Sequence, residues 1–361
     1  MIRAAIIGCG KIADVHAQQI AAISNAALVA VLDAEEMMAA QLAERYKVPT
    51  YYCDIRDMLD KERIDVVHIT TPPQSHFNLA VQCLDKGCNV YIEKPFTINT
   101  EEAINLIAFA NKKGLKLTVG HNLQFTNIAA QMRAYIRNGF LGEKPVHMES
   151  IYCYDLGNRV YAKSFLGDSN HWVRTLPGKL LQNIISHGIA KIAEFLPSEN
   201  PLVIAHAFTS DFLREIGIED IRDELRVIID DRNGCTAYFT FSSQIKPPLH
   251  QFRILGSQRG LILDEDNLSI VKLDSSNYKS YLRYLLGPRF IGKEYRRNSN
   301  KNFALLLRSK LFINPMKTLI EAFYDSISLG APLPISYREI VTVSRIMDSI
   351  FEQIDPRNTT I

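Results

Sequence analysis

The chain contains the stretch Gly8-Cys9-Gly10-Lys11-Ile12-Ala13, where the sequence predicts a strand, a tight turn and a helix in direct succession. A short apolar strand, residues 4–7, precedes it, and an apolar helical pattern follows directly. In a G-x-G-x-x-A pattern the first glycine permits the turn, the second lets a pyrophosphate approach the backbone, and the alanine allows close packing of helix and strand. The helix N-terminus then offers N–H groups and a positive dipole to phosphates. The stretch predicts a dinucleotide-binding turn, with a glycine-rich turn without a ligand as the alternative.

A second apolar strand, residues 27–32, ends at Asp33, 23 residues after Gly10. A carboxylate at this place can accept hydrogen bonds from both ribose hydroxyls, and it repels a 2′-phosphate. Residues 34–36 are Ala, Glu and Glu, so no arginine follows to bind that phosphate. The pattern therefore favours NAD over NADP. A solvated aspartate at a strand end is the alternative.

Strands and helices alternate through residue 120. The pattern predicts helices over 35–47, 75–86 and 100–113, and strands over 65–70, 89–92 and 115–119. Such alternation is typical of a doubly wound parallel α/β sheet. The sequence predicts an N-terminal Rossmann domain.

The strand at 90–92 leads directly into Glu93-Lys94-Pro95. Open α/β sheets place their ligands at the carboxyl ends of strands, which is where this tripeptide falls. Pro95 fixes its own φ and restricts Lys94 to extended conformations, so we expect the lysine on a stiff turn. Taken alone, a tripeptide of this composition is more often an ordinary surface loop.

Composition excludes several classes of protein. The 361 residues are 47% hydrophobic and 22% charged, with a formal net charge of +2, which gives no reason to expect a nucleic-acid partner. The six cysteines are scattered without a Cys-x-x-Cys pair, so we expect reduced thiols and no metal site. The start of the chain does not read as a signal peptide, and no run of 18 apolar residues occurs. These features predict a cytoplasmic protein.

The second chemical landmark is a helical stretch from about residue 180 to 195. Asn183 and His187 lie four residues apart in it and therefore project from one face. A polar pair in so apolar a helix points to solvent, to buried partners or to a cleft. The alternative to a functional pair is a solvated stripe shared with Lys191 and Glu194.

Alternating patterns later in the chain predict strands over 202–209, 224–230, 234–243 and 250–256, as in an α+β domain with a large, open, mostly antiparallel sheet. Just before them, Trp172 and Arg174 offer an aromatic beside a cation, which suits stacking on a sugar and binding of phosphate or carboxylate; an anchoring role for Trp172 is equally open.

Residues 275–312 hold nine Lys or Arg and one acid. This basic segment is interpreted as a solvated insertion, with a loop over an anionic substrate or a surface that touches anionic lipid as alternatives.

The motifs form an ordered set that resembles the Gfo/Idh/MocA oxidoreductases: the stretch 8–13 with His16, Thr70-Thr71-Pro72-Pro73 with His76, Gly87, and Glu93-Lys94-Pro95. The resemblance implies a Rossmann domain at 1–121 that binds NAD(P), and an α+β domain at 122–361 for substrate binding and oligomerisation. His16 and His76 occupy family positions, yet each reads as a packed or helix-capping histidine. The implied cofactor contacts are Gly8, Cys9, Gly10, Lys11, Ile12, Asp33, Thr71, Pro72, Pro73, His76, Glu93, Lys94 and Asn122.

The chain departs from the family pattern at three places. Gln124 replaces an arginine that family members often carry, Lys179 replaces a glycine, and Asn183 replaces an aspartate beside the expected histidine, His187. The asparagine-plus-histidine arrangement resembles relatives that act on nucleotide-linked sugars. Gln124, Trp172 and Arg174 are the candidate substrate contacts.

The resulting hypothesis is an NAD-dependent oxidoreductase acting on a secondary alcohol of a sugar, with a nucleotide sugar favoured. His187 would accept the hydroxyl proton, Lys94 would polarise the forming carbonyl, and Asn183 would orient the substrate or His187. The alternatives are a catalytically silent regulatory protein that binds dinucleotide or sugar, and a dehydrogenase of a non-sugar substrate. The resemblance also implies a homodimer or homotetramer formed through the second domain's sheet.

Overall fold

The computed structural model describes residues 1–274, 280–307 and 314–354, and the chain forms two compact units. Unit 1 comprises Met1–Asn122 and Asn314–Arg345, and unit 2 comprises Leu123–Ile313 and Ile346–Ile361. Residues 314–345, which are expected from sequence in the second domain, group in space with the first unit.

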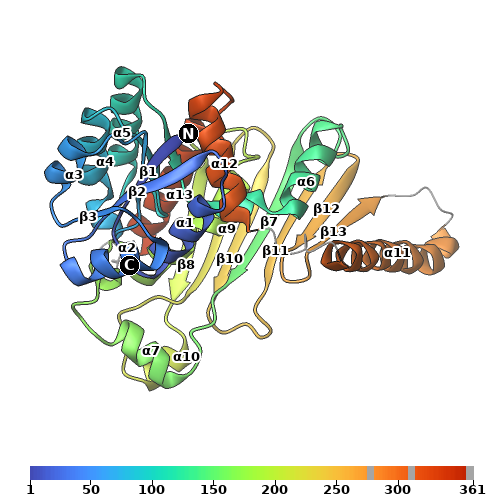
Figure 1. Ribbon diagram of the computed structural model, residues 1–361. Helices are drawn as coiled ribbons and strands as arrows, with labels where there is room; N and C mark the ends of the chain where they lie inside the picture. The colour runs from blue at the N-terminus through green and yellow to red at the C-terminus, as the bar shows by residue number, and fades with distance from the viewer. Residues whose placement is uncertain (275–279, 308–313, 355–361) are drawn as a thin grey trace. The chain divides into compact units, whose positions relative to one another are not determined.

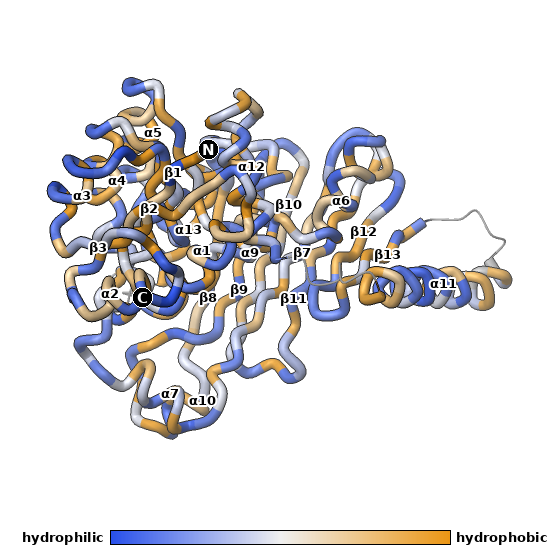
Figure 2. The backbone as a smooth tube through the Cα atoms, in the orientation of Figure 1, coloured by the Kyte–Doolittle hydropathy of each residue, from blue (hydrophilic) through white to orange (hydrophobic). Residues whose placement is uncertain are grey.

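Unit 1 contains a six-stranded, fully parallel sheet in the order β3-β2-β1-β4-β5-β6 (Figure 1). Its strands are β1 (Ile2–Ile7), β2 (Ala26–Leu32), β3 (Thr50–Tyr52), β4 (Val66–Ile69), β5 (Asn89–Ile92) and β6 (Leu117–Val119). Hydrophobic residues predominate along β1 and β2 (Figure 2), as expected for strands covered on both faces. The order reverses at β1, which confirms the predicted doubly wound Rossmann sheet.

Helices connect the strands of unit 1, and the last of them along the chain begins and ends at residues that cap a helix. They are α1 (Lys11–Ala21), α2 (Glu36–Tyr46), α3 (Ile55–Lys61), α4 (His76–Asp85) after the short 3-10 turn η1 (Pro73–Ser75), and α5 (Thr100–Lys113). At the start of α5 the side chain of Asn99 accepts a hydrogen bond from Glu102 N at 2.8 Å, and Gly114 ends the helix with φ +69°.

Two helices from the end of the chain complete unit 1. They are α12 (Pro315–Ser328) and the first half of α13 (Tyr337–Ile354). The Tyr324 hydroxyl lies 2.8 Å from His68 Nε2 in β4, and the ring of Phe323 packs 6.3 Å from that of Tyr91 in β5. These buried contacts, with sequence separations above 200 residues, explain why 314–345 groups with the Rossmann sheet.

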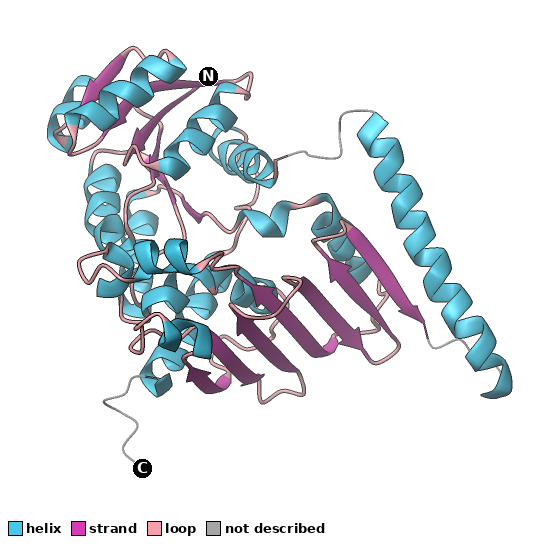
Figure 3. Cartoon of the chain, turned by 90° about the horizontal axis from the view of Figure 1, so that it is seen from below, coloured by secondary structure: helices cyan, strands magenta, loops and turns pink. Residues whose placement is uncertain are grey.

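Unit 2 is built on a seven-stranded sheet in the order β13-β12-β11-β7-β10-β9-β8. Figure 3 draws the strands of this sheet in magenta. Only the β7–β10 pair is parallel, so the prediction of an open, mostly antiparallel sheet is confirmed. The strands are β7 (Pro145–Cys153), β8 (Leu202–Phe208), β9 (Glu224–Asp230), β10 (Thr236–Ser242), β11 (His250–Gly256), β12 (Arg259–Asp264) and β13 (Ser269–Asp274).

After η2 (Asn122–Phe125), which begins at the last residue of the first segment of unit 1, the helices of unit 2 are α6 (Asn127–Arg137), α7 (Arg159–Leu166), η3 (Trp172–Thr175), α8 (Lys179–Ile184), α9 (Ser186–Ala193), α10 (Asp211–Glu215), α11 (Ser280–Leu307) and the second half of α13. The single helix predicted near 180–195 is thus two helices that meet at Ile185. A Cβ on Gly188 in α9 would lie 2.3 Å from the ring of Phe239 in β10, so a glycine is needed for α9 to pack this closely on the sheet.

The described part of the basic segment, α11, is one helix of 28 residues that contacts β13 at the edge of the sheet. Residues 275–279 and 308–312 of that segment lie outside the described residues. Across the described ranges, every helix is too short or too polar to cross a membrane.

Candidate active site

The turn after β1 is shaped for close approach by a ligand. Gly8 has φ +95°, and a Cβ there would lie 2.7 Å from Thr71 Cγ2, so both conformation and space require glycine. Gly10 precedes α1, no atom lies within 4 Å of the place its Cβ would take, and no side chain caps the helix there. Lys11 and Ile12 are exposed in the first turn. Helix dipole, backbone N–H groups and open space fit a pyrophosphate.

Asp33 is held beside this turn by backbone donors. Cys9 N donates to Asp33 Oδ2 at 2.6 Å, and Glu35 N donates to Oδ1 at 3.0 Å. The half-buried carboxylate keeps lone pairs for further donors, as the hydroxyls of a ribose require. Cys9 itself is buried, and burial together with Asp33 raises the pKa of its thiol to about 12. Cys9 is therefore a packing residue with a backbone role.

His76 joins two of the predicted cofactor loops. Its Nε2 lies 2.8 Å from the carbonyl oxygen of Thr71, and its Nδ1 lies 3.0 Å from that of Pro95. The side chain is fully buried; burial lowers its pKa, and the contacts with the backbone carbonyls of Thr71, Phe96 and Pro95 counteract part of that effect. The loop with Pro72 and Pro73 is thereby fixed to the loop that carries Lys94. This geometry agrees with the interpretation of His76 as a packed histidine.

Glu93 lies under Lys94 at the carboxyl end of β5. Its side chain is 7% exposed, with Oε1 2.9 Å from His16 Nε2 and Oε2 accepting from Lys94 N at 3.1 Å. A Cβ on Gly120, the residue after β6, would lie 2.7 Å from Glu93 Oε1 and would displace this carboxylate. Burial raises the pKa of Glu93, but the contacts with His16 and Lys94 outweigh it and hold the pKa below its usual value. The carboxylate is therefore ionised.

Lys94 is half-buried, and its peptide bond to Pro95 is cis. Burial lowers the pKa of its ammonium group, and the charge of Glu93 counteracts part of that effect. The neighbouring His121 is 2% exposed, and burial lowers its pKa to about 4. Asn122 follows at the start of η2 and is half-buried. The proton affinity of the Lys94 side chain thus depends on the neighbouring carboxylate of Glu93.

A chain of buried hydrogen bonds extends behind Glu93. His16 Nδ1 lies 2.9 Å from His68 Nδ1, and His68 Nε2 lies 2.8 Å from the hydroxyl of Tyr324. Burial and the neighbouring His16 hold the pKa of His68 well below its usual value, so His68 is neutral. With one ring proton on each imidazole and an ionised Glu93, one order satisfies every contact: Tyr324 donates to His68, His68 to His16, and His16 to Glu93.

Sequence reasoning missed His68 and Tyr324. The signal for His68 was a lone histidine in the buried strand Val66–Ile69, where each unpaired polar atom is costly. No comparable signal marked Tyr324, because its partner is 256 residues away.

In unit 2, Asn183 lies in α8 and His187 in α9, and both side chains are half-buried. The ring of His187 lies 6.0 Å from that of Tyr152. One turn further, Lys191 is buried and its Nζ lies 2.6 Å from Glu265 Oε2. The alternative of a solvated stripe was wrong for this face, because Lys191 is buried and Glu194 is ion-paired with Arg133.

Two of the three candidate substrate contacts, Gln124 and Arg174, bind other residues of unit 2. Gln124 is buried, and its Nε2 donates to Ala190 O at 3.3 Å and to Glu194 Oε2 at 3.2 Å. Arg174 donates to both carboxylate oxygens of Asp220, at 2.9 and 2.8 Å. Trp172 is half-buried in η3, with its ring 5.7 Å from that of His171. Arg174 is therefore engaged within the fold, in an ion pair with Asp220.

Lys179 also binds Asp220, through its Nζ at 2.5 Å. Its backbone has φ +46°, the left-handed region that favours glycine. This is the position at which the family pattern carries a glycine.

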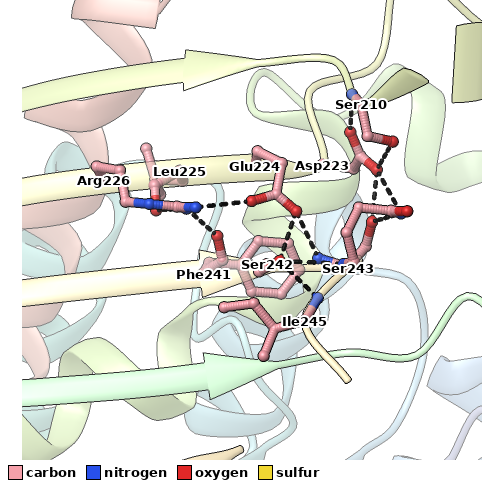
Figure 4. Close-up of polar contacts among 10 residues, drawn as sticks. Ser210, Asp223, Glu224, Leu225, Arg226, Phe241, Ser242, Ser243 and Ile245 are labelled. Carbon is pink, nitrogen blue, oxygen red and sulfur yellow. Dashed lines mark hydrogen bonds and ion pairs between the residues drawn. The ribbon is translucent and has the colours of Figure 1, made fainter. Parts of the chain in front are cut away.

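A second group of buried carboxylates lies at the ends of β9 and β10 (Figure 4). Asp223 accepts from Ser210 N at 2.7 Å and Ser210 Oγ at 2.6 Å, and Glu224 accepts from Arg226 Nη2 at 2.9 Å and from Ser242 Oγ at 2.5 Å. Neighbouring donors thus bind both carboxylates, as in a cluster that stabilises strand ends rather than a catalytic pair. The described residues contain no group of three or more metal-ligating side chains.

Comparison with known proteins agrees with this geometry. Residues 2–121 match an oxidoreductase family with an NAD-binding Rossmann fold, Gfo/Idh/MocA. The chain is 35% identical over 143 residues to a D-glucoside 3-dehydrogenase of Escherichia coli K12, a match that covers 39% of this chain and 41% of the relative. The chain spans less than half the length of the curated relatives it matches.

Solved structures extend the likeness in fold beyond residues 2–121. The UDP-N-acetylglucosamine 3-dehydrogenase GnnA of Acidithiobacillus ferrooxidans is 20% identical with a TM-score of 0.72, covering 98% of this chain and 97% of that one. The WlbA dehydrogenase of Bordetella pertussis, solved with NADH and UDP-GlcNAcA, is 15% identical with a TM-score of 0.77, covering 98% and 95%. At these identities the likeness establishes the fold.

Proposed function

We propose that this chain is an NAD-dependent dehydrogenase that oxidises a secondary alcohol of a sugar, with a nucleotide-linked sugar as the substrate class. The observation that carries the proposal is the ionised, buried Glu93 beneath Lys94 at the carboxyl end of β5. The same sheet edge bears the Gly8–Gly10 turn and Asp33. A cation held beside a dinucleotide site is the arrangement that hydride transfer to or from a carbonyl carbon needs.

NAD is the proposed cofactor because of Asp33. Its carboxylate is fixed at the end of β2 by Cys9 N and Glu35 N, where it would accept from the ribose hydroxyls and repel a 2′-phosphate. When bound, the nicotinamide ring takes up the hydride released from the sugar carbon. The residues proposed to hold NAD are those of the Gly8–Ile12 turn, the Thr71–Pro73 loop and Asn122.

Side chains of the protein would accept the proton of the sugar hydroxyl and stabilise its oxygen. We propose that His187 accepts the hydroxyl proton as the carbon loses its hydride, so that alcohol becomes ketone and the histidine becomes an imidazolium. Lys94 would donate a hydrogen bond to the oxygen as it turns into a carbonyl. Asn183, four residues before His187 and in the preceding helix α8, would orient the sugar hydroxyl.

A nucleotide-linked sugar is favoured by two observations. Asn183 carries no charge where the family pattern has an aspartate, as in the arrangement that the sequence resembles. The two structural neighbours named above are, by name or bound ligand, proteins of UDP-linked sugars. The oxidised carbon and the individual sugar would be found by scanning NAD reduction against free and nucleotide-linked sugars.

The deciding experiment removes the cation of Lys94. We expect Lys94→Ala to lower turnover about 10²–10³-fold, the range seen when one stabilising donor is lost. Affinity for NADH, measured by fluorescence titration, should stay within about threefold because the turn and Asp33 are intact. Lys112→Ala, an exposed lysine on α5, is the matched control. Unchanged turnover of the Lys94 variant would reject the assignment.

We also propose that two copies associate through the outer face of the unit 2 sheet. One row across neighbouring strands, Ile204–Ile228–Tyr238, is exposed although it is apolar. The opposite face is covered by α9 on β7 and β10 and by α6 on β12 and β13. An open apolar sheet face of this kind is suited to a self-complementary interface.

A further inference from the structure

Helix α11 is anchored along the free edge of the unit 2 sheet. The Asn298 side chain makes a two-point contact with β13: its Oδ1 accepts from Ile270 N at 3.2 Å, and its Nδ2 donates to Ile270 O at 2.9 Å. Lys272 and Glu294 add an ion pair at 3.6 Å. The helix thus covers an edge strand that would otherwise present unpaired backbone groups. This anchoring fixes which sides of α11 face away from the sheet.

One of those sides is apolar. Large exposed side chains on α11 are Tyr281, Tyr284, Leu285, Tyr295, Phe303, Leu306 and Leu307, with Tyr284 at 85% and Phe303 at 63% exposure. At about 100° per residue, those at positions 281, 285, 295, 303 and 306 fall within an arc of about 80°. Figure 2 shows hydrophilic and hydrophobic residues alternating along the helix. Exposed tyrosine, phenylalanine and leucine side chains that gather on one side of a helix indicate a binding face.

The adjoining side is basic. Five exposed cations, Arg289, Lys293, Arg296, Arg297 and Lys301, occupy the next arc of about 140°. The only acid of the helix, Glu294, is buried against Lys272, and no described carboxylate forms an ion pair with the five cations. Partial burial and the charge of Arg297 lower the pKa of Lys301, which reflects the crowding of like charges.

The combination selects one kind of partner. A nucleic acid would contact the basic arc and leave the apolar side of α11 exposed to water. A second copy of α11 would place its five cations close to the five cations of the first copy, and these like charges would repel each other. A bilayer with anionic headgroups uses both: the cations meet phosphates while Tyr, Phe and Leu enter the boundary of the acyl chains. The polar content of α11 excludes a spanning helix, so it would lie in the plane of the interface.

We propose that α11 docks this chain on membrane surfaces that contain anionic lipid. The proposal is independent of the chemistry assigned to Lys94 and His187.

The test is co-sedimentation of the full chain with vesicles. We expect at least tenfold more binding to phosphatidylcholine–phosphatidylglycerol (7:3) than to phosphatidylcholine alone at 50 mM salt, and loss of most binding at 0.5 M NaCl. K293E/R296E should lower the affinity at least tenfold, and so should F303S/L306S, with thermal unfolding unchanged. The matched controls are K112E/R137E and I104S/V160S, which alter exposed residues elsewhere.

Three outcomes would overturn the proposal: equal binding to both vesicle types, wild-type affinity in both α11 variants, or binding of an RNA or DNA oligonucleotide without binding of vesicles. The salt dependence of the unaltered protein keeps the test decisive if a variant fails to fold.

Discussion

Nε2 of His16 lies 2.9 Å from Oε1 of Glu93, and both side chains are buried behind Lys94. This contact joins the first helix of the chain to the end of the fifth strand. It gives the carboxylate a donor in place of water, so that Glu93 stays ionised in a buried position. The histidine therefore acts on Lys94 through Glu93, as a positioning residue.

Removing the negative charge of Glu93 should shift the pH dependence of the reaction. Without that carboxylate, burial alone acts on Lys94, and the pKa of its ammonium group falls further. We expect Glu93→Gln to move the alkaline limb of the kcat/KM profile to lower pH. Glu101→Gln, on the exposed start of α5, is the control. An unmoved alkaline limb would show that Glu93 does not set the proton affinity of Lys94.

Tyr324→Phe should destabilise unit 1. The change deletes the hydroxyl that donates to His68 Nε2 and leaves a buried acceptor unsatisfied, a loss of about 1–3 kcal/mol in the free energy of unfolding. Urea unfolding followed by fluorescence would measure it. Tyr281→Phe deletes an exposed hydroxyl and should change nothing. Equal stability of the two variants would contradict the proton order assigned to the Tyr324–His68–His16–Glu93 chain.

Asp33→Asn should weaken NADH binding and reduce the ratio of the affinity for NADH to the affinity for NADPH. A hydrogen bond to a charged group contributes about 1.5–3 kcal/mol, so affinity for NADH should fall roughly 10- to 150-fold. Affinity for NADPH should change less, since the repulsion of its 2′-phosphate is removed. Parallel titrations of both cofactors provide the measurement, with Asp57→Asn on α3 as control. Tighter binding of NADPH than of NADH by the unaltered protein would reject the assignment of NAD.

Stability should fall as the solution is acidified below pH 6.5. Burial lowers the folded-state pKa of His68, His76 and His121, that of His121 to about 4, so below pH 6.5 the unfolded chain binds more protons than the folded one. Each histidine then contributes a slope of about 1.4 kcal/mol per pH unit. Glu93, whose pKa is lowered, adds a loss at still lower pH.

Denaturant unfolding between pH 7 and 4 would measure the slope. His121→Gln should reduce it by about 1.4 kcal/mol per pH unit. His206→Gln, at an exposed position, should leave it unchanged. A stability that does not vary over this pH range would show that these histidines are not buried in neutral form.

The outer sheet face offers a test of assembly. Ile228→Lys places a charge in the centre of the apolar row between Ile204 and Tyr238. If that row forms the interface, the variant should elute as a monomer in light-scattering chromatography while the unaltered chain elutes as a dimer or tetramer. Thr240→Lys, one residue pair away on the same face, would show how far the interface extends. A monomeric unaltered chain would end the proposal.

Much of the first unit was predictable from sequence because its signals are local. The turn at Gly8–Ala13, Asp33 at the end of the second strand and Glu93-Lys94 at the end of the fifth are each set by a few consecutive residues, and a parallel sheet brings such strand ends to one edge. The strands of unit 2 were likewise predictable from alternating patterns. The break at Ile185 was not, since the apolar positions of α8 and α9 continue across it with helical spacing.

The sequence by itself determined the Rossmann order, the dinucleotide turn and the identity of the groups able to move a proton, because spacing and side-chain chemistry suffice for these. Tertiary structure alone decided the partners of those groups. It brought Tyr324 to His68 from 256 residues away, bound Arg174 and Lys179 to Asp220, and joined 314–345 to the first unit. Such contacts depend on which buried surfaces meet after folding, and no local pattern records them.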